Sequence, residues 1–125
     1  MPNVVLIMQR KAIAEALMIK LRDSPHINLI YEPDYNDVLI AISSNNTKAA
    51  LIEATESGPY NMNYCLQVCE NLREQRPECK LLLMCPEQDE KSVKQVVDAK
   101  AENKIDDFVF YDVTIDYLES KLISI

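Results

Sequence analysis

Four acidic side chains stand where they could form a cation site. Glu53, Glu56, Glu87 and Asp112 each end or closely follow a short apolar segment. Carboxylate oxygens are the ligands that hard divalent cations prefer, so the four residues allow a site of that kind. Acidic residues are also the ordinary surface of a chain with a net charge of −7, and both interpretations stay open.

The cysteines and the single histidine offer less chemistry. Cys65, Cys69, Cys79 and Cys85 form no C-x-x-C pair. Cys65 and Cys69 share an apolar helical face, which favours buried thiols over metal ligands. Cys85, near carboxylates, should have a raised pKa and low reactivity. His26 lies in a turn without a neighbouring nucleophile, so we expect no metal, no cofactor and no catalytic residue.

Composition excludes several classes of protein. Gly58 is the only glycine, whereas loops that cradle phosphates need several. Twenty acidic against thirteen basic residues repel phosphate backbones and anionic lipid, so the sequence predicts no nucleic-acid binding by this domain. The longest apolar runs have five or six residues, too few to span a membrane. The cysteine usage favours a cytoplasmic location.

Five apolar segments alternate with five amphipathic ones. The apolar segments, which predict strands, are residues 4–8, 27–31, 49–54, 80–85 and 108–111. Helices are predicted over residues 11–21 and 35–42, from Met62 to before Pro77, after Asp89 with Val93, Val96 and Val97 inward, and from Thr114 to the end.

This alternation predicts a fold as well as its elements. Apolar strands joined by helical crossovers favour a parallel sheet covered on both faces. A five-unit chain of 125 residues fits a single flavodoxin-like domain, a three-layer α/β sandwich with strand order 2-1-3-4-5. In such a sheet, ligands bind at the carboxyl ends of the strands, so the residues at those ends decide function.

At this point the chain resembles the receiver domains of bacterial two-component response regulators over its whole length. The resemblance is carried by element order and by N-V-V-L-I-M-Q, A-A-L-I-E-A, L-L-L-M-C-P-E and F-V-F-Y-D-V-T. It implies an acidic pair that holds Mg²⁺ after the first strand and a phosphoacceptor Asp after the third. It also implies a Thr or Ser after the fourth strand and a Lys-Pro pair after the fifth.

Every one of these positions is occupied by another residue. The acidic pair falls on Met8 and Gln9, or on Gln9 and Arg10 with a shift of one; the other positions carry Glu53, Cys85, Tyr111 and Asp112. Thioether and amide groups are poor Mg²⁺ ligands, and a tyrosine cannot supply a lysine's charge. We therefore expect a degenerate phosphoacceptor site, a pseudo-receiver that is not an enzyme.

Glu53 has two possible roles. Its negative charge could imitate a phosphorylated Asp and hold an active-like state. Alternatively, it pairs with Arg10 or Lys11 in the loop after the first strand, which would replace Mg²⁺ and Lys electrostatically.

Aromatic residues suggest an interaction surface. Phe108 stands where receivers carry an aromatic switch residue, although an aromatic residue at a strand start is common. Tyr111 and Tyr117 would add exposed area to the face made by the fourth helix, fifth strand and fifth helix, the family's usual dimer surface.

We therefore expect a phosphorylation-independent signalling module that acts through a homodimer or by docking a protein partner. The resemblance also allows an effector domain after Ile125. The alternative is a flavodoxin-like protein that binds a small molecule or divalent cation at the acidic strand ends. An anion site at Arg10 and Lys11 is a third option.

Overall fold

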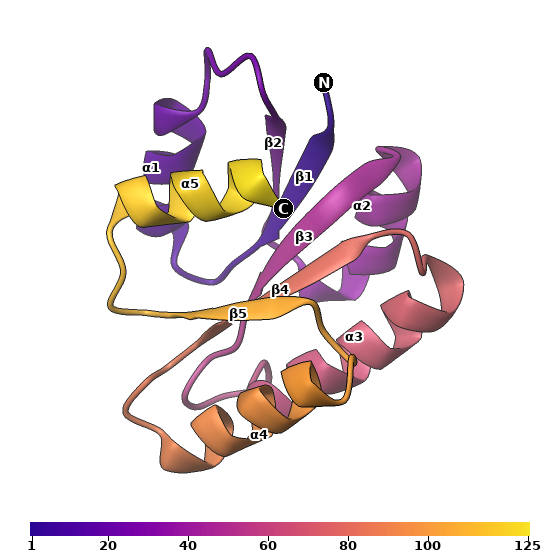
Figure 1. The fold of residues 1–125 in the computed structure, drawn as a ribbon, viewed down its shortest axis with the longest axis vertical. Helices are drawn as coiled ribbons and strands as arrows, with labels where there is room; N and C mark the ends of the chain where they lie inside the picture. Colours follow the sequence, from indigo (N-terminus) through magenta and orange to yellow (C-terminus); the bar gives the residue numbers. More distant parts are fainter.

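The computed structural model describes all residues 1–125. Five strands alternate with five α-helices, and a short 3₁₀ helix, η1, precedes the second α-helix (Figure 1). The strands are β1 (Asn3–Ile7), β2 (Asn28–Glu32), β3 (Thr47–Glu53), β4 (Lys80–Cys85) and β5 (Asp107–Phe110). The helices are α1 (Lys11–Lys20), η1 (Tyr35–Asp37), α2 (Val38–Ser44), α3 (Met62–Gln75), α4 (Glu90–Ala101) and α5 (Ile115–Ser124).

The strands form one parallel sheet in the order β2-β1-β3-β4-β5. This confirms the predicted fold class and strand order. The register pairs Ile7 at the end of β1 with Ile52 of β3, and Glu53 with Met84 of β4. The carboxyl ends of β1, β3 and β4 therefore lie side by side, and the loops that follow them meet at one edge of the sheet.

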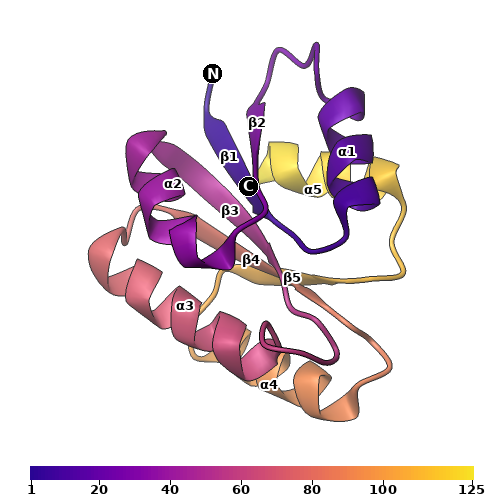
Figure 2. The same cartoon turned by 180° about the vertical axis from the view of Figure 1, so that it is seen from behind.

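Helices cover both faces of the sheet. Helices α2, α3 and α4 lie on one face and α1 and α5 on the other, as the two opposite views show (Figures 1 and 2). The strand interiors are apolar on both sides, because consecutive residues such as Val4 and Val5 point into different cores and both are fully buried. This explains why the strands read as continuous apolar runs rather than alternating ones.

The structure corrects some details of the predicted elements. Strand β3 begins at Thr47, two residues before the predicted start, and β5 ends at Phe110, one residue before the predicted end. The segment 35–42 begins as a 3₁₀ turn before it becomes α2. Val97 is 46% exposed rather than inward, because it follows the buried Val96 and successive helical residues point about 100° apart.

Candidate functional site

Glu53 is the centre of the predicted site, and it is completely buried. One carboxylate oxygen, Oε1, accepts hydrogen bonds from the main-chain N–H of Gln9 at 2.7 Å and of Arg10 at 2.9 Å. The other oxygen, Oε2, forms an ion pair with Nε of Arg10. Both oxygens therefore have partners within the protein, and all of these partners come from the loop after β1.

Arg10 is the cation of this site. It lies three residues after the end of β1 and caps the start of α1, and this turn brings its side chain to the end of β3. Its guanidinium carbon lies 3.9 Å from the ring centre of Tyr111, and Nη2 contacts the sulfur of Met84 at 3.0 Å. Of the two partners that the sequence left open for Glu53, the structure has Arg10, whereas Lys11 faces Glu15 on the helix surface.

Tyr111 closes the site from the other side. Its hydroxyl donates a hydrogen bond to the carbonyl of Ala54, and its main-chain N–H donates to Glu87. Burial, followed by the negative charge of Glu53, raises the pKa of the Tyr111 hydroxyl, so the group remains a neutral donor. Tyr111 was predicted to add exposed aromatic area beside β5, but its side chain turns inward over Arg10 and is only partly exposed.

Two further tyrosines fix the same edge of the sheet. The hydroxyl of Tyr35, a buried residue of η1, donates to the carbonyl of Glu53 at 2.6 Å. The hydroxyl of Tyr31, at the end of β2, donates to the carbonyl of Met8 at 3.0 Å. The sequence analysis missed these contacts. The only signal for them is that Tyr31 and Tyr35 flank the point where β2 ends at this edge.

The side chains of the remaining predicted site residues offer Glu53 no donor or ligand group. Met8 is fully buried in the core under α1 and α5, and Gln9 reaches Glu53 through its main chain while its side chain is exposed. Cys85 is also fully buried, and its thiol contacts the carbonyl of Pro86 at 3.7 Å. Burial raises the pKa of this thiol to about 11, as the sequence predicted in direction.

The acidic residues of the sequence analysis do not assemble into one cation site. Glu53 turns to Arg10, whereas Glu87 accepts the N–H of Tyr111, and no group of three acidic, cysteine or histidine side chains could hold a metal ion. Glu56, Glu87 and Tyr111 line a shallow hollow of about 190 Å³ at this edge. That is below the roughly 300 Å³ at which small-molecule pockets begin.

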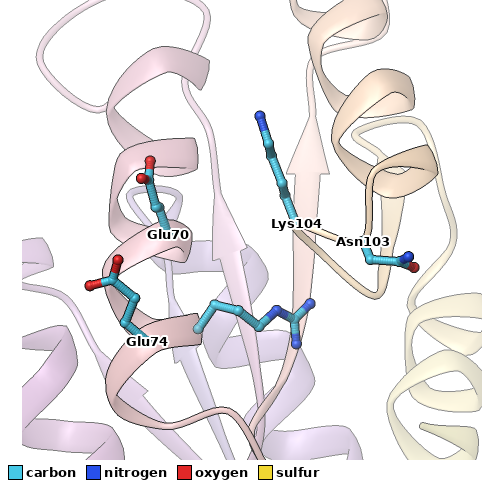
Figure 3. Close-up of a pocket in the computed structure, with 5 residues that line it drawn as sticks. Glu70, Glu74, Asn103 and Lys104 are labelled. Carbon is cyan, nitrogen blue, oxygen red and sulfur yellow. The ribbon is translucent and has the colours of Figure 1, made fainter.

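A larger hollow, of about 290 Å³, lies away from this site. Figure 3 shows its walls, with Glu70 and Glu74 on α3 and with Asn103 and Lys104 in the turn after α4. These residues lie toward the amino ends of β4 and β5, at the edge of the sheet opposite to Glu53. None of the predicted site residues takes part in it.

The predicted interface aromatics differ in exposure. Tyr117, on α5, is 49% exposed, while Phe108 is half-buried and packs edge-on against Phe110 at 5.5 Å between ring centres. Lys100 of α4 and Lys121 of α5 both pair with Asp107 at the start of β5. The ion pairs therefore tie the three elements of this face together within one chain.

Comparison with known proteins rests on structure alone. No family model matches the chain, and no curated protein matches it in sequence. A receiver domain of a two-component response regulator from Bacteroides fragilis superposes with a TM-score of 0.81 at 15% identity, covering 99% of this chain and 95% of that one. The fold is that of a receiver domain.

Two other solved structures have the same fold. An orphan response regulator of H. pylori gives a TM-score of 0.78 at 14% identity, over 98% of this chain and 94% of that one. A CheY-like protein, TadZ, from Pseudomonas aeruginosa PAO1 gives 0.68 at 17% identity, over 98% and 97%. At these identities the likeness establishes the fold, and the function must be argued from the site. No helix has the length and apolarity that crossing a membrane requires.

Proposed function

We propose that this chain is a pseudo-receiver, a non-enzymatic signalling module of the response-regulator type that works without aspartyl phosphorylation. The observation that carries the proposal is that the Glu53 carboxylate is buried and already bound within the protein. This residue ends β3, where the resemblance to receiver domains implies the phosphoacceptor, and both of its oxygens are bound by Arg10 and the adjacent main chain. The receiver fold supplies the framework for this interpretation.

Phosphoryl transfer would have to dismantle this arrangement. The reaction depends on cations that neutralise the phosphoryl oxygens and on a carboxylate oxygen free to attack. Here Arg10 already neutralises Glu53, and releasing the buried carboxylate from this partly exposed arginine costs about 2–3 kcal/mol. Met8 and Gln9 offer no carboxylate that would bring Mg²⁺ to the site.

Acetyl phosphate with Mg²⁺, followed by intact-mass spectrometry, tests the proposal. We expect no mass increase of one phosphoryl group, under conditions in which a receiver domain with a complete acidic site, measured alongside, is modified. A phosphoryl adduct that disappears in Glu53→Gln would overturn the proposal, because it would show that the carboxylate leaves Arg10 and reacts.

The output of the module is proposed to be a homodimer or a docked protein partner on the α4–β5–α5 face. Val97 and Tyr117 are both about half exposed there, and such apolar and aromatic side chains suit a protein interface. The pairs of Asp107 with Lys100 and Lys121 hold the face in one arrangement, which fits a surface that is fixed rather than switched. An effector domain following Ile125 would be one way to use it.

A further inference from the structure

A groove between α2 and α3 lies on a different side of the molecule from the α4–β5–α5 face. Its hollow has a volume of about 220 Å³, and none of the nine lining residues is charged. The partly exposed apolar side chains in it include Leu39 of α2 and Tyr64 and Val68 of α3. Three exposed carboxamides, Asn36, Asn71 and Gln75, supply its polar groups. The groove is therefore apolar inside and uncharged along its walls.

The chain that leads into the groove is acidic. Glu32, Asp34 and Asp37 lie between the end of β2 and the start of α2, and none of them has a cationic group within 4.0 Å. The charge of Asp34 also reaches the groove, because it contributes, after burial and the neighbouring Tyr60 and Cys65, to raising the pKa of Tyr64. At the far end, Arg76 donates to Ser43 of α2 at 3.1 Å. Arg76 also pairs with Glu78 at 3.9 Å, so the unpaired charge along the groove is the negative charge at its η1 end.

We propose that this groove docks a basic amphipathic helix of a protein partner. One large apolar side chain of that helix fills the hollow, and its lysines or arginines lie beside Glu32, Asp34 and Asp37. The volume is below the roughly 300 Å³ of small-molecule pockets, which suits a single buried anchor better than a free ligand. Both walls are helices whose main-chain groups are internally bonded, so a helix rather than an added strand fits between them.

The groove is connected to Glu53 through an aromatic stack. Tyr35 lines the groove, and its hydroxyl bonds to the carbonyl of Glu53. Its ring stacks on Tyr60, in the loop after β3, with ring centres 4.1 Å apart, and Tyr60 in turn meets Tyr64 edge-on at 5.2 Å. A side chain anchored against Tyr35 and Tyr64 therefore restrains the main chain that carries Glu53.

The test is a titration of the ¹⁵N-labelled protein with two synthetic helical peptides that share one leucine face. One peptide carries lysines and the other glutamates on the polar face. We expect saturable binding of the lysine peptide only, weakening with salt, and amide shifts concentrated in η1–α2 and α3. Equal binding of both peptides, no binding up to about 1 mM, or shifts centred on α4–β5–α5 would each overturn the proposal.

Matched variants locate the contact. Val68→Lys, which fills and charges the groove, should weaken binding about tenfold or more. Ile19→Lys, a matched apolar-to-lysine change at an exposed position of α1 on the other face of the sheet, should alter it less than about twofold. Equal weakening of peptide binding by both variants would refute the groove as the site. If Val68→Lys fails to fold, the amide shifts of the wild-type protein decide whether the peptide binds in the groove. If Val68→Lys abolishes a homodimer in sedimentation, a second copy occupies the groove and the proposal is wrong.

Tyr35→Phe tests the connection to Glu53. This variant keeps the ring stack but removes the hydroxyl that binds the carbonyl of Glu53. The lysine peptide should still bind, while its effect on the Glu53 and Ala54 amides should disappear. An undiminished shift at those amides would refute the coupling. Neither result depends on whether Glu53 can be phosphorylated, so this proposal and the pseudo-receiver proposal fail separately.

Discussion

Replacing Arg10 by methionine should destabilise the fold by leaving Glu53 as a buried charge. The variant keeps an apolar stem beside Tyr111 and Met84 but removes the only cation paired with Glu53. Removing one partner of a buried pair costs about 3–5 kcal/mol. The Arg10 side chain is 37% exposed, and two main-chain N–H groups remain on the carboxylate, so we expect the lower figure of about 2–3 kcal/mol.

Thermal unfolding measures this loss. An unfolding entropy of about 2.1 cal/mol/K per residue gives about 0.26 kcal/mol/K for 125 residues, so Tm should fall by about 8–11 °C. Lys11→Met is the matched control, because Lys11 is adjacent in the chain and its pair with Glu15 is exposed. Exposed pairs of this kind contribute about 0.3–0.5 kcal/mol, so the control should shift Tm by less than about 2 °C.

A double-mutant cycle of Arg10→Met and Glu53→Gln tests whether the stability change caused by Glu53→Gln reverses its sign when Arg10 is absent. In the wild type, Glu53→Gln should destabilise the protein by about 1–2 kcal/mol, because an amide then faces the guanidinium of Arg10. In the Arg10→Met background the same change should stabilise by about 1 kcal/mol, since it removes the uncompensated charge and still accepts the two N–H groups. If Glu53→Gln lowers stability equally in both backgrounds, Arg10 does not neutralise Glu53 and our account of the site is wrong.

Three further predictions concern metal binding, self-association and acid stability. Titration calorimetry with Mg²⁺ or Mn²⁺ should show no saturable site tighter than about millimolar, and such a site would favour the cation-binding alternative. Sedimentation at tens of micromolar should show a dimer that Tyr117→Ala weakens and Ile40→Ala, exposed on α2, does not; a strictly monomeric protein would leave only docking to another protein. Burial alone would raise the pKa of Asp107, but hydrogen bonds from Lys121, Lys100 and the N–H of Phe108 outweigh it and lower the pKa. Because the folded-state pKa is lowered, this stabilisation is present above the unfolded value of about 3.9 and is lost as pH falls through the folded value. Asp107→Asn should therefore cost about 1 kcal/mol at pH 7 and less at pH 3 in urea denaturation, and an equal cost at both pH values would refute the assignment.

The structure also changes which variants can test the interface. Charge reversal at Lys94 or Lys100 would be a poor test, because these lysines of α4 already pair with Asp98 and Asp107 within the same chain. Reversing either charge would disturb the protomer as well as any dimer. Tyr35 is fully buried and bonded to Glu53, so its removal is no neutral control for a surface effect. Tyr117 and Ile40 avoid both problems because they are exposed.

The sequence predicted the fold well because its signals are local and repeated. Each apolar strand and amphipathic helix is visible by itself, and parallel crossovers leave few ways to connect five such units. The place of Glu53 followed from the same reasoning, since the last residue of a central strand must lie at the carboxyl edge. Arg10 was one of two candidate ion-pair partners of Glu53, because it lies in the loop after the neighbouring strand β1.

Side-chain direction was less predictable. Position 111 follows an edge strand, and the sequence does not determine whether a tyrosine there turns outward to solvent or inward over Arg10. The inward rotamer depends on partners from elsewhere in the chain, the guanidinium of Arg10 and the carbonyl of Ala54. The bonds from Tyr31 and Tyr35 likewise join elements distant in sequence, so no periodic pattern reveals them.

The charges at the site connect the residue types at positions 8, 9 and 10 with the state of Glu53. Several carboxylates at one edge would repel one another and need a divalent cation to hold them. Met8 and Gln9 bring no further carboxylate, so Glu53 is the buried carboxylate of the site, and a single guanidinium with two N–H dipoles is sufficient to bind it. Placing aspartates at positions 8 and 9 would not restore a metal site, because the side chain of Met8 lies in the core and Arg10 still occupies Glu53. Metal-dependent chemistry at this edge would thus require coordinated changes at Arg10 and in the core under α1 and α5, which is why the pseudo-receiver proposal treats the ion pair as taking the place of a bound metal.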